Sequence, residues 1–343
     1  MTRILCIGGP GVLSTSTLAA LAARGEEVAL LTHTDKHLQD VPPGVTVLRG
    51  DRNDPAAIQA ALDAFRPQVV VDFVLFRPEQ AKVLIGLLAG HVEQYVFVST
   101  VDVYGYPLSH LPMRESDPWM PPNCDYAACK RQCEELFGSV GRADLPLTIV
   151  RPAYSFGPRF ILSFMGRDGG RSMLARLRDG RPVLTPGDGT TLMHAGCAYD
   201  TGRMIAAVAG APHAVGKDYT VGQRTFMTHD AYVQMFASAL GVTPRIVHIP
   251  TDLIVSVDAP EARTSLLHDL TRFNVAFSVE QFCADFPAFT WQWDLDEWAA
   301  HCVTWNQEQD LLPGPDEVLF DDRLIAAYEQ SADRVRAAVT AQS

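Results

Sequence analysis

Short apolar runs alternate with helix-like segments through the first half of the chain. The apolar runs are 3–7, 28–31, 45–48, 69–73, 94–98 and 147–150, and the run 69–73 is rich in β-branched residues, as expected of a strand buried on both faces. Between the runs, residues 12–23 have helical composition and end at Arg24-Gly25, and Asp54-Pro55 offers a capping side chain followed by a first-turn proline. Strands alternating with helices predict an α/β fold, with a parallel sheet covered by helices on both sides.

The later part of the chain has a different pattern. Regular alternation fades after Pro158, although Thr228 is placed to cap a helix that ends at Gly241. Further helix-like stretches lie near 294–304 and 322–341. We therefore expect one domain formed by residues 1–158 and about 195–223. A smaller C-terminal substrate-binding domain, built from insertions, is expected to take about 159–194 and 224–343.

Composition narrows the class of protein. With 47 % hydrophobic residues in 343, the chain has ample material for a buried core, and its net charge of −12 argues against nucleic acid as the main partner. Seven cysteines without zinc-like spacing fit free thiols and predict no metal site. No run approaches the roughly 20 apolar residues of a membrane span. These features predict a cytoplasmic protein that does not bind a membrane.

A glycine-rich turn follows the first predicted strand. The segment CIGGPGVLS has the pattern Gly8-x-x-Gly11-x-x-Ser14 and opens the next helix at Val12 and Leu13. Glycine allows the backbone to turn tightly and to approach a pyrophosphate, and the helix N-terminus offers free N–H groups to the phosphates. The position predicts a dinucleotide site, with a purely structural turn as the alternative.

The end of the second strand bears on cofactor choice. A carboxylate at this tip would bind the adenosine ribose and favour NAD. The chain instead carries Thr32 and His33, with Lys36 close behind. Hydroxyl, imidazole and ammonium groups suit a 2′-phosphate better, so we expect NADP, with NAD as the alternative. A solvated loop would also explain His33 and Lys36.

Tyr126 and Lys130 stand four residues apart in DYAACK, which puts them on one face of a predicted helix. A nearby ammonium and a positive nicotinamide ring would both lower the pKa of the phenol, so that it exchanges a proton with a substrate hydroxyl. Upstream, an apolar strand ends in Ser99-Thr100, and a hydroxyl there would hold the substrate oxygen against Tyr126.

Taken together, these motifs resemble the extended short-chain dehydrogenase/reductase family, in its NAD-dependent epimerase/dehydratase group. The resemblance covers roughly residues 3–240. It rests on Gly8, Gly11, GDRND at 50–54, VSTVDVYG at 98–105, Tyr126-x-x-x-Lys130, RPAYSFGP at 151–158, PGDGT at 186–190 and Asp200. It implies a Rossmann-type doubly wound sheet and an enzyme that uses a nicotinamide cofactor.

The resemblance also implies roles for single residues. It makes Tyr126 the acid/base and Thr100 its active-site hydroxyl partner, while Lys130 binds the nicotinamide ribose. It places Asp51 at the adenine. The remaining cofactor contacts expected from it are Arg52 and Phe73.

Asp102 matches a position where dehydratase and decarboxylase relatives often carry a second base. It is either a second catalytic acid/base or a turn cap. The neighbouring acid of dehydratases is replaced here by Val101, which puts 4,6-dehydration in doubt.

Two departures concern the substrate. Relatives that bind nucleotide sugars often carry asparagine where this chain has Tyr154, and arginine where it has Met193 beside His194. A sugar diphosphate would need other donors, for which the candidates are Arg167, Arg176 and Arg181. The expected substrate-binding residues are Tyr154, Arg176, Met193 and His194.

We therefore expect an oxidoreductase or epimerase that acts on a secondary alcohol or ketone of a sugar, nucleotide sugar or glycosylated metabolite. A ketoreductase without epimerisation, and a dinucleotide-sensing or RNA-associated protein of the same fold, are the alternatives. A homodimer is expected by analogy with relatives.

Overall fold

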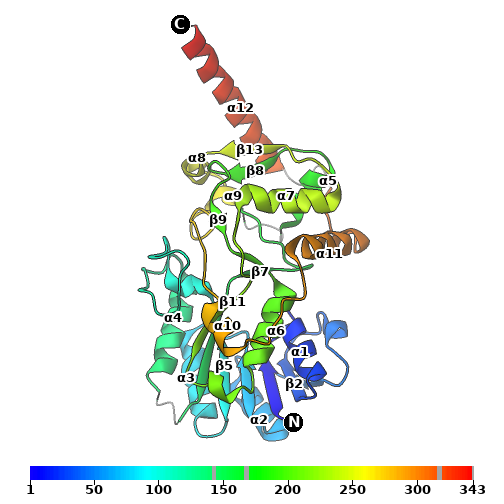
Figure 1. The fold of residues 1–343 in the computed structure, drawn as a ribbon, viewed down its shortest axis with the longest axis vertical. Coiled ribbons are helices and arrows are strands. Elements are labelled where there is room, and N and C mark those ends of the chain that lie inside the picture. The colour runs from blue at the N-terminus through cyan, green and yellow to red at the C-terminus, as the bar shows by residue number, and fades with distance from the viewer. Residues whose placement is uncertain (141–143, 166–169, 315–318, 342–343) are drawn as a thin grey trace. The chain divides into compact units, whose positions relative to one another are not determined.

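The structure is a computed structural model that describes residues 1–140, 144–165, 170–314 and 319–341 (Figure 1). The chain divides into two compact units. The first contains Met1–Ser155, His194–Thr225 and Val275–Trp293, and the second contains Phe156–Met193, Phe226–Asn274 and Asp294–Ser343. The division expected from the sequence kept everything after residue 224 together, whereas Val275–Trp293 returns to the first unit.

The first unit is built on a seven-stranded sheet with the order β11-β6-β5-β4-β1-β2-β3. All of its strands run parallel. The strands are β1 Arg3–Ile7, β2 Glu27–Thr32, β3 Thr46–Arg49, β4 Val69–Asp72, β5 Gln94–Val98, β6 Leu147–Pro152 and β11 Asp218–Val221. Because the strands are parallel, their carboxyl ends lie along one edge of the sheet, and the loops that follow them meet there.

Helices cover both faces of this sheet (Figure 1). They are α1 Ser14–Ala23, α2 Pro55–Phe65, α3 Pro78–Leu88, α4 Asp125–Gly138, α6 Ala198–Val208 and α10 Glu280–Asp285, with short 3-10 turns η1 Leu38–Asp40, η2 Val101–Tyr104 and η4 Pro212–Ala214. Alternate residues of β1 enter different cores: Ile4 packs with α1 and α6, and Leu5 packs with α2, α3 and α4. Two-sided burial explains why the strands read as continuous apolar runs.

Local signals in the sequence predicted much of this unit. β1 and β5 have the predicted bounds. Asp54 caps α2 by accepting a hydrogen bond from the Ala56 N–H at 2.9 Å. The expected α/β class with a Rossmann-type parallel sheet is confirmed.

The second unit has small sheets and its own core. Its strands are β8 Val183–Pro186 parallel to β13 Ile246–Ile249, and β9 Leu192–Met193 antiparallel to β12 Met227–Thr228. Its helices are α5 Arg171–Arg178, α7 His229–Leu240, α8 Thr251–Ser256, α9 Pro260–Arg263, α11 Leu295–Glu308 and α12 Leu319–Thr340. As predicted, Thr228 caps α7, and Gly241 ends it in the left-handed conformation.

Two further short strands, β7 Tyr154–Phe156 and β10 Ala195–Cys197, pair with each other. Among the helices of the described ranges, none combines the length and the apolar character needed to cross a bilayer.

Candidate active site

The glycine-rich turn joins β1 to α1 at the carboxyl edge of the sheet. Gly8 has a φ of +87°, and a Cβ at this position would overlap the side chain of Val74. The Gly11 N–H donates to Oγ of Ser14 at 2.8 Å, so the serine at the third motif position ties the turn to the start of the helix. Val12 and Leu13, both partly exposed, lead into α1. A bare backbone followed by a helix N-terminus is a shape that fits a pyrophosphate.

The loop after β3 holds two expected cofactor residues in different environments. Asp51 is exposed, and its carboxylate accepts from the Asn53 N–H at 2.9 Å. Arg52 turns inward instead and forms a buried ion pair with Asp72, the last residue of β4. Asp51 is therefore available to an adenine, while the Arg52 guanidinium is used within the protein. Phe73 follows β4 and is partly buried.

The tip of β2 carries the residues expected to read the adenosine ribose. Thr32 is buried at the strand end, whereas His33 and Lys36 are exposed. Arg49, at the end of the neighbouring strand β3, donates to the Thr34 carbonyl at 2.8 Å and pairs with the Asp35 carboxylate at 2.6 Å. Arg49 is therefore a further basic group at this loop, which sequence reasoning missed.

Thr100 follows β5 and opens a short 3-10 turn. Its hydroxyl donates to Oδ2 of Asp102 at 3.0 Å and accepts from the Asp102 N–H at 3.2 Å. This Ser/Thr turn is the local structure expected of a hydroxyl residue two positions ahead of an acid. It brings a carboxylate to the carboxyl end of β5, where the predicted catalytic hydroxyl lies.

Two tyrosines extend the interactions of Asp102. The Tyr106 hydroxyl donates to Oδ1 of Asp102 at 2.8 Å, and the Tyr154 hydroxyl donates to that of Tyr106 at 2.7 Å. Tyr106 is buried and Tyr154 is partly exposed. The departure at Tyr154 thus places a phenol in the same hydrogen-bonded group as Thr100.

Tyr126 lies in the first turn of α4, with 42 % of its surface exposed. Burial of its phenol and the Asp102 carboxylate raise its pKa, while an interaction with the Thr100 hydroxyl opposes this. The direction is opposite to that predicted from Lys130. A raised pKa favours the protonated phenol.

The side chain of Lys130 is engaged with other groups. Its ammonium donates to the Val98 carbonyl at 2.8 Å, and its side chain is 1 % exposed. Its Nζ lies 4.9 Å from the ring centroid of Phe76 and 4.8 Å from that of Phe97. Burial lowers the pKa of Lys130 to about 8. Phe76 also lies 6.2 Å from the Tyr126 ring, centroid to centroid.

Three of the four expected substrate residues lie in the interior. Met193 is buried, and Arg176 is 1 % exposed with an ion pair to Asp322 at 2.6 Å. His194 is fully buried, its Nε2 lies 2.7 Å from the Gln223 carbonyl, and its Nδ1 accepts from a backbone N–H. Of the four, only Tyr154 is brought into the group around Thr100. Arg167 lies outside the described residues.

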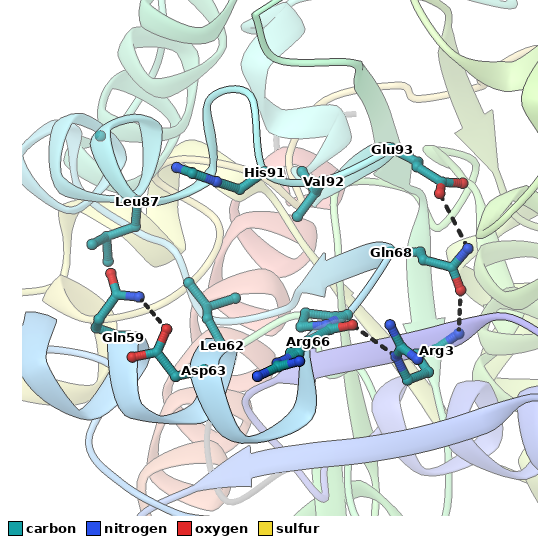
Figure 2. A pocket seen from close by; sticks show the side chains of 12 residues that line it. Arg3, Gln59, Leu62, Asp63, Arg66, Gln68, Leu87, His91, Val92 and Glu93 are labelled. Atoms are coloured by element: carbon teal, nitrogen blue, oxygen red, sulfur yellow. Dashed lines mark hydrogen bonds between the residues drawn. The ribbon is translucent and has the colours of Figure 1, made fainter.

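The opposite edge of the sheet holds a separate hollow of about 570 Å³ (Figure 2). It is lined by the start of β1 and the ends of α2 and α3. Gln68 bridges the Arg3 N–H and the Glu93 carboxylate, at 3.2 and 3.1 Å. Gln59 donates to Asp63 at 2.8 Å. Its charges are mixed, and it lies away from the edge that carries the glycine turn and Thr100.

Besides Arg49, three contributors were missed by sequence reasoning. Phe76 and Tyr106 carried a usable signal, because each is an aromatic residue shortly after a motif strand. Asp72 carried none, because an acid inside an apolar run reveals neither its burial nor its partner.

Comparisons with known proteins point to one family. The sequence profile of the NAD dependent epimerase/dehydratase family matches residues 4–222. A 2′-dehydrokanamycin reductase from Streptomyces kanamyceticus is 27 % identical over 226 residues, which cover 62 % of this chain and 60 % of that protein. The chain thus matches less than two thirds of the length of this relative.

Solved structures show the same fold across nearly the whole chain. The UDP-glucose 4-epimerase of Thermus thermophilus, in complex with NAD, has a TM-score of 0.69 at 21 % identity and covers 89 % of this chain and 99 % of its own. The dTDP-glucose 4,6-dehydratase of Bacillus anthracis str. Ames, also with NAD, has a TM-score of 0.71 at 17 % identity and covers 90 % and 98 %.

The profile match spans more than half of the chain, and the described residues provide the glycine turn, the parallel sheet and the tyrosine–lysine helix. The chain belongs to the NAD dependent epimerase/dehydratase family, a family of enzymes.

Proposed function

We propose that the protein is an NAD(P)-dependent oxidoreductase that reduces a ketone of a sugar or glycosylated metabolite to a secondary alcohol. The observation that carries this proposal is the placement of Tyr126 against Thr100 and Asp102 at the carboxyl edge of the sheet. A phenol beside a hydroxyl can hold one substrate oxygen from two sides and give it a proton.

Each residue has a distinct part in this scheme. Tyr126 donates its phenolic proton to the carbonyl oxygen as that oxygen gains negative charge. Thr100 positions the oxygen, and Lys130 lies one helical turn beyond Tyr126 on α4. A nicotinamide dinucleotide, held by the Gly8–Ser14 turn, supplies the hydride when bound.

The protonation state of Tyr126 favours reduction over oxidation. Ketone reduction needs an acid, and burial together with Asp102 raises the pKa of this phenol and keeps its proton in place. The similar reductase from Streptomyces kanamyceticus bears the name of a ketone-reducing enzyme. Epimerisation would in addition require the ketone to turn over and be reduced on its other face.

We also propose that NADP(H) is preferred to NAD(H). Support comes from the tip of β2, where His33 and Lys36 are exposed and Arg49 reaches the Thr34 carbonyl. Three basic groups near one loop favour a 2′-phosphate, although the Asp35 carboxylate offsets part of the charge of Arg49.

The test uses purified protein with 2′-dehydrokanamycin as a ketone probe and UDP-glucose as an epimerisation probe. We expect oxidation of NADPH in the presence of the ketone, and a 10²- to 10⁴-fold loss of turnover in Tyr126→Phe, roughly the contribution of a general acid. Thermal unfolding of the variant should match the parent. Phe226→Leu, an exposed residue of the second unit, serves as the matched control for loss of an aromatic group.

Release of nucleotide by denaturation separates the two reaction types. Tightly held NAD together with conversion of UDP-glucose would establish an epimerase and overturn the proposal of net reduction. Full turnover in Tyr126→Phe would overturn the role given to the phenol.

A further inference from the structure

We propose that helix α12 pairs with the α12 of a second copy of this chain, in antiparallel orientation, to form a homodimer. The pairing surface is an apolar face of the helix, which we call the α12 stripe. It consists of Tyr328, Ala332, Val335 and Val339. The inference concerns assembly and goes beyond the proposed reaction, on which it does not depend.

The α12 stripe has the spacing of a helix that packs along one side. Its residues lie four, three and four positions apart, and Ile325 precedes Tyr328 by three. Alternating steps of three and four keep side chains on one face of a helix, as in the seam of a coiled coil. The stripe therefore continues the face on which Ile325 lies.

The two ends of this face have different surroundings. Ile325 is buried in the core of the second unit, and Tyr328 packs against that core. Further along the helix, residues 333–341 are all exposed, and they include Val335 at 61 % and Val339 at 64 %. Figure 1 shows this end of the helix extending beyond β8 and β13. The same face thus passes from the core into solvent and keeps its apolar residues.

An exposed helix end of this kind gains stability from a partner. Isolated helices of about 12 residues or fewer are marginal in water, because most helical stability comes from the packing of an apolar face. The segment 333–340 is helical although every residue in it is exposed. A second copy brings an identical apolar face, and contact between the two would cover Val335 and Val339 in both chains.

The order of residues in the stripe favours an antiparallel pair. One alignment places Ala332 against the partner's Val335. The same alignment places Tyr328 against the partner's Val339, so the stripe is matched along its whole length. Each helix then ends beside the Tyr328 of the other copy, where packing against the core of the second unit begins. Every contact occurs twice, once from each copy, as two-fold symmetry requires.

Charges beside the stripe favour the same arrangement. Glu329 and Arg336 each follow a stripe residue directly, so both flank the stripe on the same side. The antiparallel alignment brings Glu329 to the partner's Arg336, whereas a parallel pair would not bring these two side chains together.

Both side chains are accessible to a partner. Glu329 is 44 % exposed and pairs with Arg245 at 2.5 Å, and Arg336 is 74 % exposed and pairs with Asp333 at 2.7 Å. Exposed ion pairs of this kind contribute little to stability, so they do not prevent either side chain from turning to the partner. Two attractive contacts between the copies would therefore form beside the apolar seam.

The first experiment follows association of the full chain by sedimentation velocity. We expect a dimer with a Kd on the order of 10 µM, because the contact is small. Val335→Glu should raise the Kd at least about tenfold, because it places a charge within the apolar contact. Ala337→Glu is the matched control, since it adds the same charge at an exposed position on the opposite face. Its Kd should stay within about twofold of that of the parent.

Two outcomes of this experiment overturn the proposal. One is a parent protein that stays monomeric up to several hundred micromolar, roughly thirtyfold above the expected Kd. The other is a dimer that Val335→Glu does not weaken. If circular dichroism shows that Val335→Glu has lost helix, Val335→Ala carries the same comparison, because alanine keeps the helix and removes the apolar contact.

The second experiment tests the antiparallel register. Glu329→Arg and Arg336→Glu each set like charges against one another in a symmetric pair, so each variant alone should dimerise about tenfold more weakly than the parent. An equimolar mixture restores opposite charges at both contacts and should dimerise like the parent. This recovery should shrink as salt is raised. Arg334→Glu, at an exposed position away from the seam, is the control and should dimerise like the parent.

A mixture that associates no better than its two components overturns the antiparallel pairing. Neither experiment uses a substrate or a cofactor. Failure of the dimer therefore leaves the proposed reduction standing, and a parent protein that reduces no ketone leaves the dimer to be judged by sedimentation alone.

Discussion

The ammonium of Lys130 donates to the carbonyl of Val98, the last residue of β5, at 2.8 Å, and it lies within 5 Å of the ring centroids of Phe76 and Phe97. This position costs stability, because a charged amine loses its hydration there. The pKa of Lys130 falls to about 8 in the folded chain, mainly through burial, against an ordinary value of 10.5.

The depressed pKa predicts a rise in stability with pH. Between about pH 8 and 10.5 the unfolded chain binds more protons at Lys130 than the folded chain does, so raising the pH favours folding. Below pH 8 the full cost, about 3 kcal/mol, is present. We therefore expect the free energy of unfolding in urea to rise with pH across this window in the parent. In Lys130→Met this rise should be absent, so the parent gains stability relative to the variant.

Lys82 on α3 is exposed, and Lys82→Met is the control. Its free energy of unfolding should differ from that of the parent by the same amount at every pH. Parallel pH curves for the parent and Lys130→Met would contradict the buried, weakened ammonium.

We predict that a second substitution restores part of the stability lost when Gly8 is replaced. An alanine here meets the side chain of Val74, in addition to the strain of a φ of +87°. Gly25 has a φ of +81° with no atom within 4 Å of an added Cβ, so Gly25→Ala reports the strain alone. We expect Gly8→Ala to lose at least about 2 kcal/mol more stability than Gly25→Ala.

Gly8→Ala with Val74→Ala should recover part of that difference, because two methyl groups that obstruct the new Cβ are removed. Binding of NADPH, measured by calorimetry, should recover in parallel. An equal loss in Gly8→Ala and Gly25→Ala would show that the contact with Val74 does not matter.

We expect the buried His194 to make the stability of the first unit sensitive to acid. Its Nδ1 accepts from the Phe277 N–H at 3.1 Å, so protonation there would break a buried hydrogen bond. Burial lowers its pKa to about 4, from an ordinary 6.5. Stability is therefore fully present above pH 6.5 and is lost as the pH falls toward 4, by about 3 kcal/mol.

His194→Gln offers a donor and an acceptor in similar places and does not titrate. We expect its unfolding free energy to fall less steeply than that of the parent between pH 6.5 and about 4, in guanidinium titrations at fixed ionic strength. His229 also contributes to the pH dependence of the unfolding free energy, because burial lowers its pKa to about 4 as well. Some acid dependence should therefore remain in His194→Gln. An unchanged slope would mean that His194 is already charged in the folded protein.

Sequence patterns predicted the elements whose signals are local. The cap at Asp54 and the start and end of α7 depend on neighbouring residues, and both lie where they were predicted. The direction of Lys130 and the burial of His194 depend on partners far along the chain. The Phe277 N–H that meets His194 is 83 residues away, in the segment whose return to the first unit was not predicted.

The same limit applied to the phenol of Tyr126. The spacing of Tyr126 and Lys130 placed them on one helix, but the pKa of Tyr126 is set by its burial and by Asp102, which reaches it from another element. The spacing of a motif predicts which residues share a helix face. The groups that shift the pKa of a residue are brought to it by packing, which the spacing does not predict.

Arg49 provides a test of the proposed preference for NADPH over NADH. Its guanidinium reaches the loop after β2 through the Thr34 carbonyl at 2.8 Å, and it stays 45 % exposed beside Asp35. A 2′-phosphate would add a charge-assisted hydrogen bond to this group, worth about 1.5–3 kcal/mol. Arg49→Ser should therefore raise the Kd for NADPH about tenfold or more and leave that for NADH within about twofold, as measured by calorimetry.

Asp35→Asn gives the opposite test at the same place. Removing its charge frees the guanidinium, so binding of NADPH should tighten while that of NADH changes little. Arg66→Ser, an exposed arginine beside the hollow at the opposite edge of the sheet, is the control and should alter neither Kd. If Arg49→Ser weakens NADH as much as NADPH, the residue only supports the loop, and the preference for a phosphorylated cofactor does not arise from it.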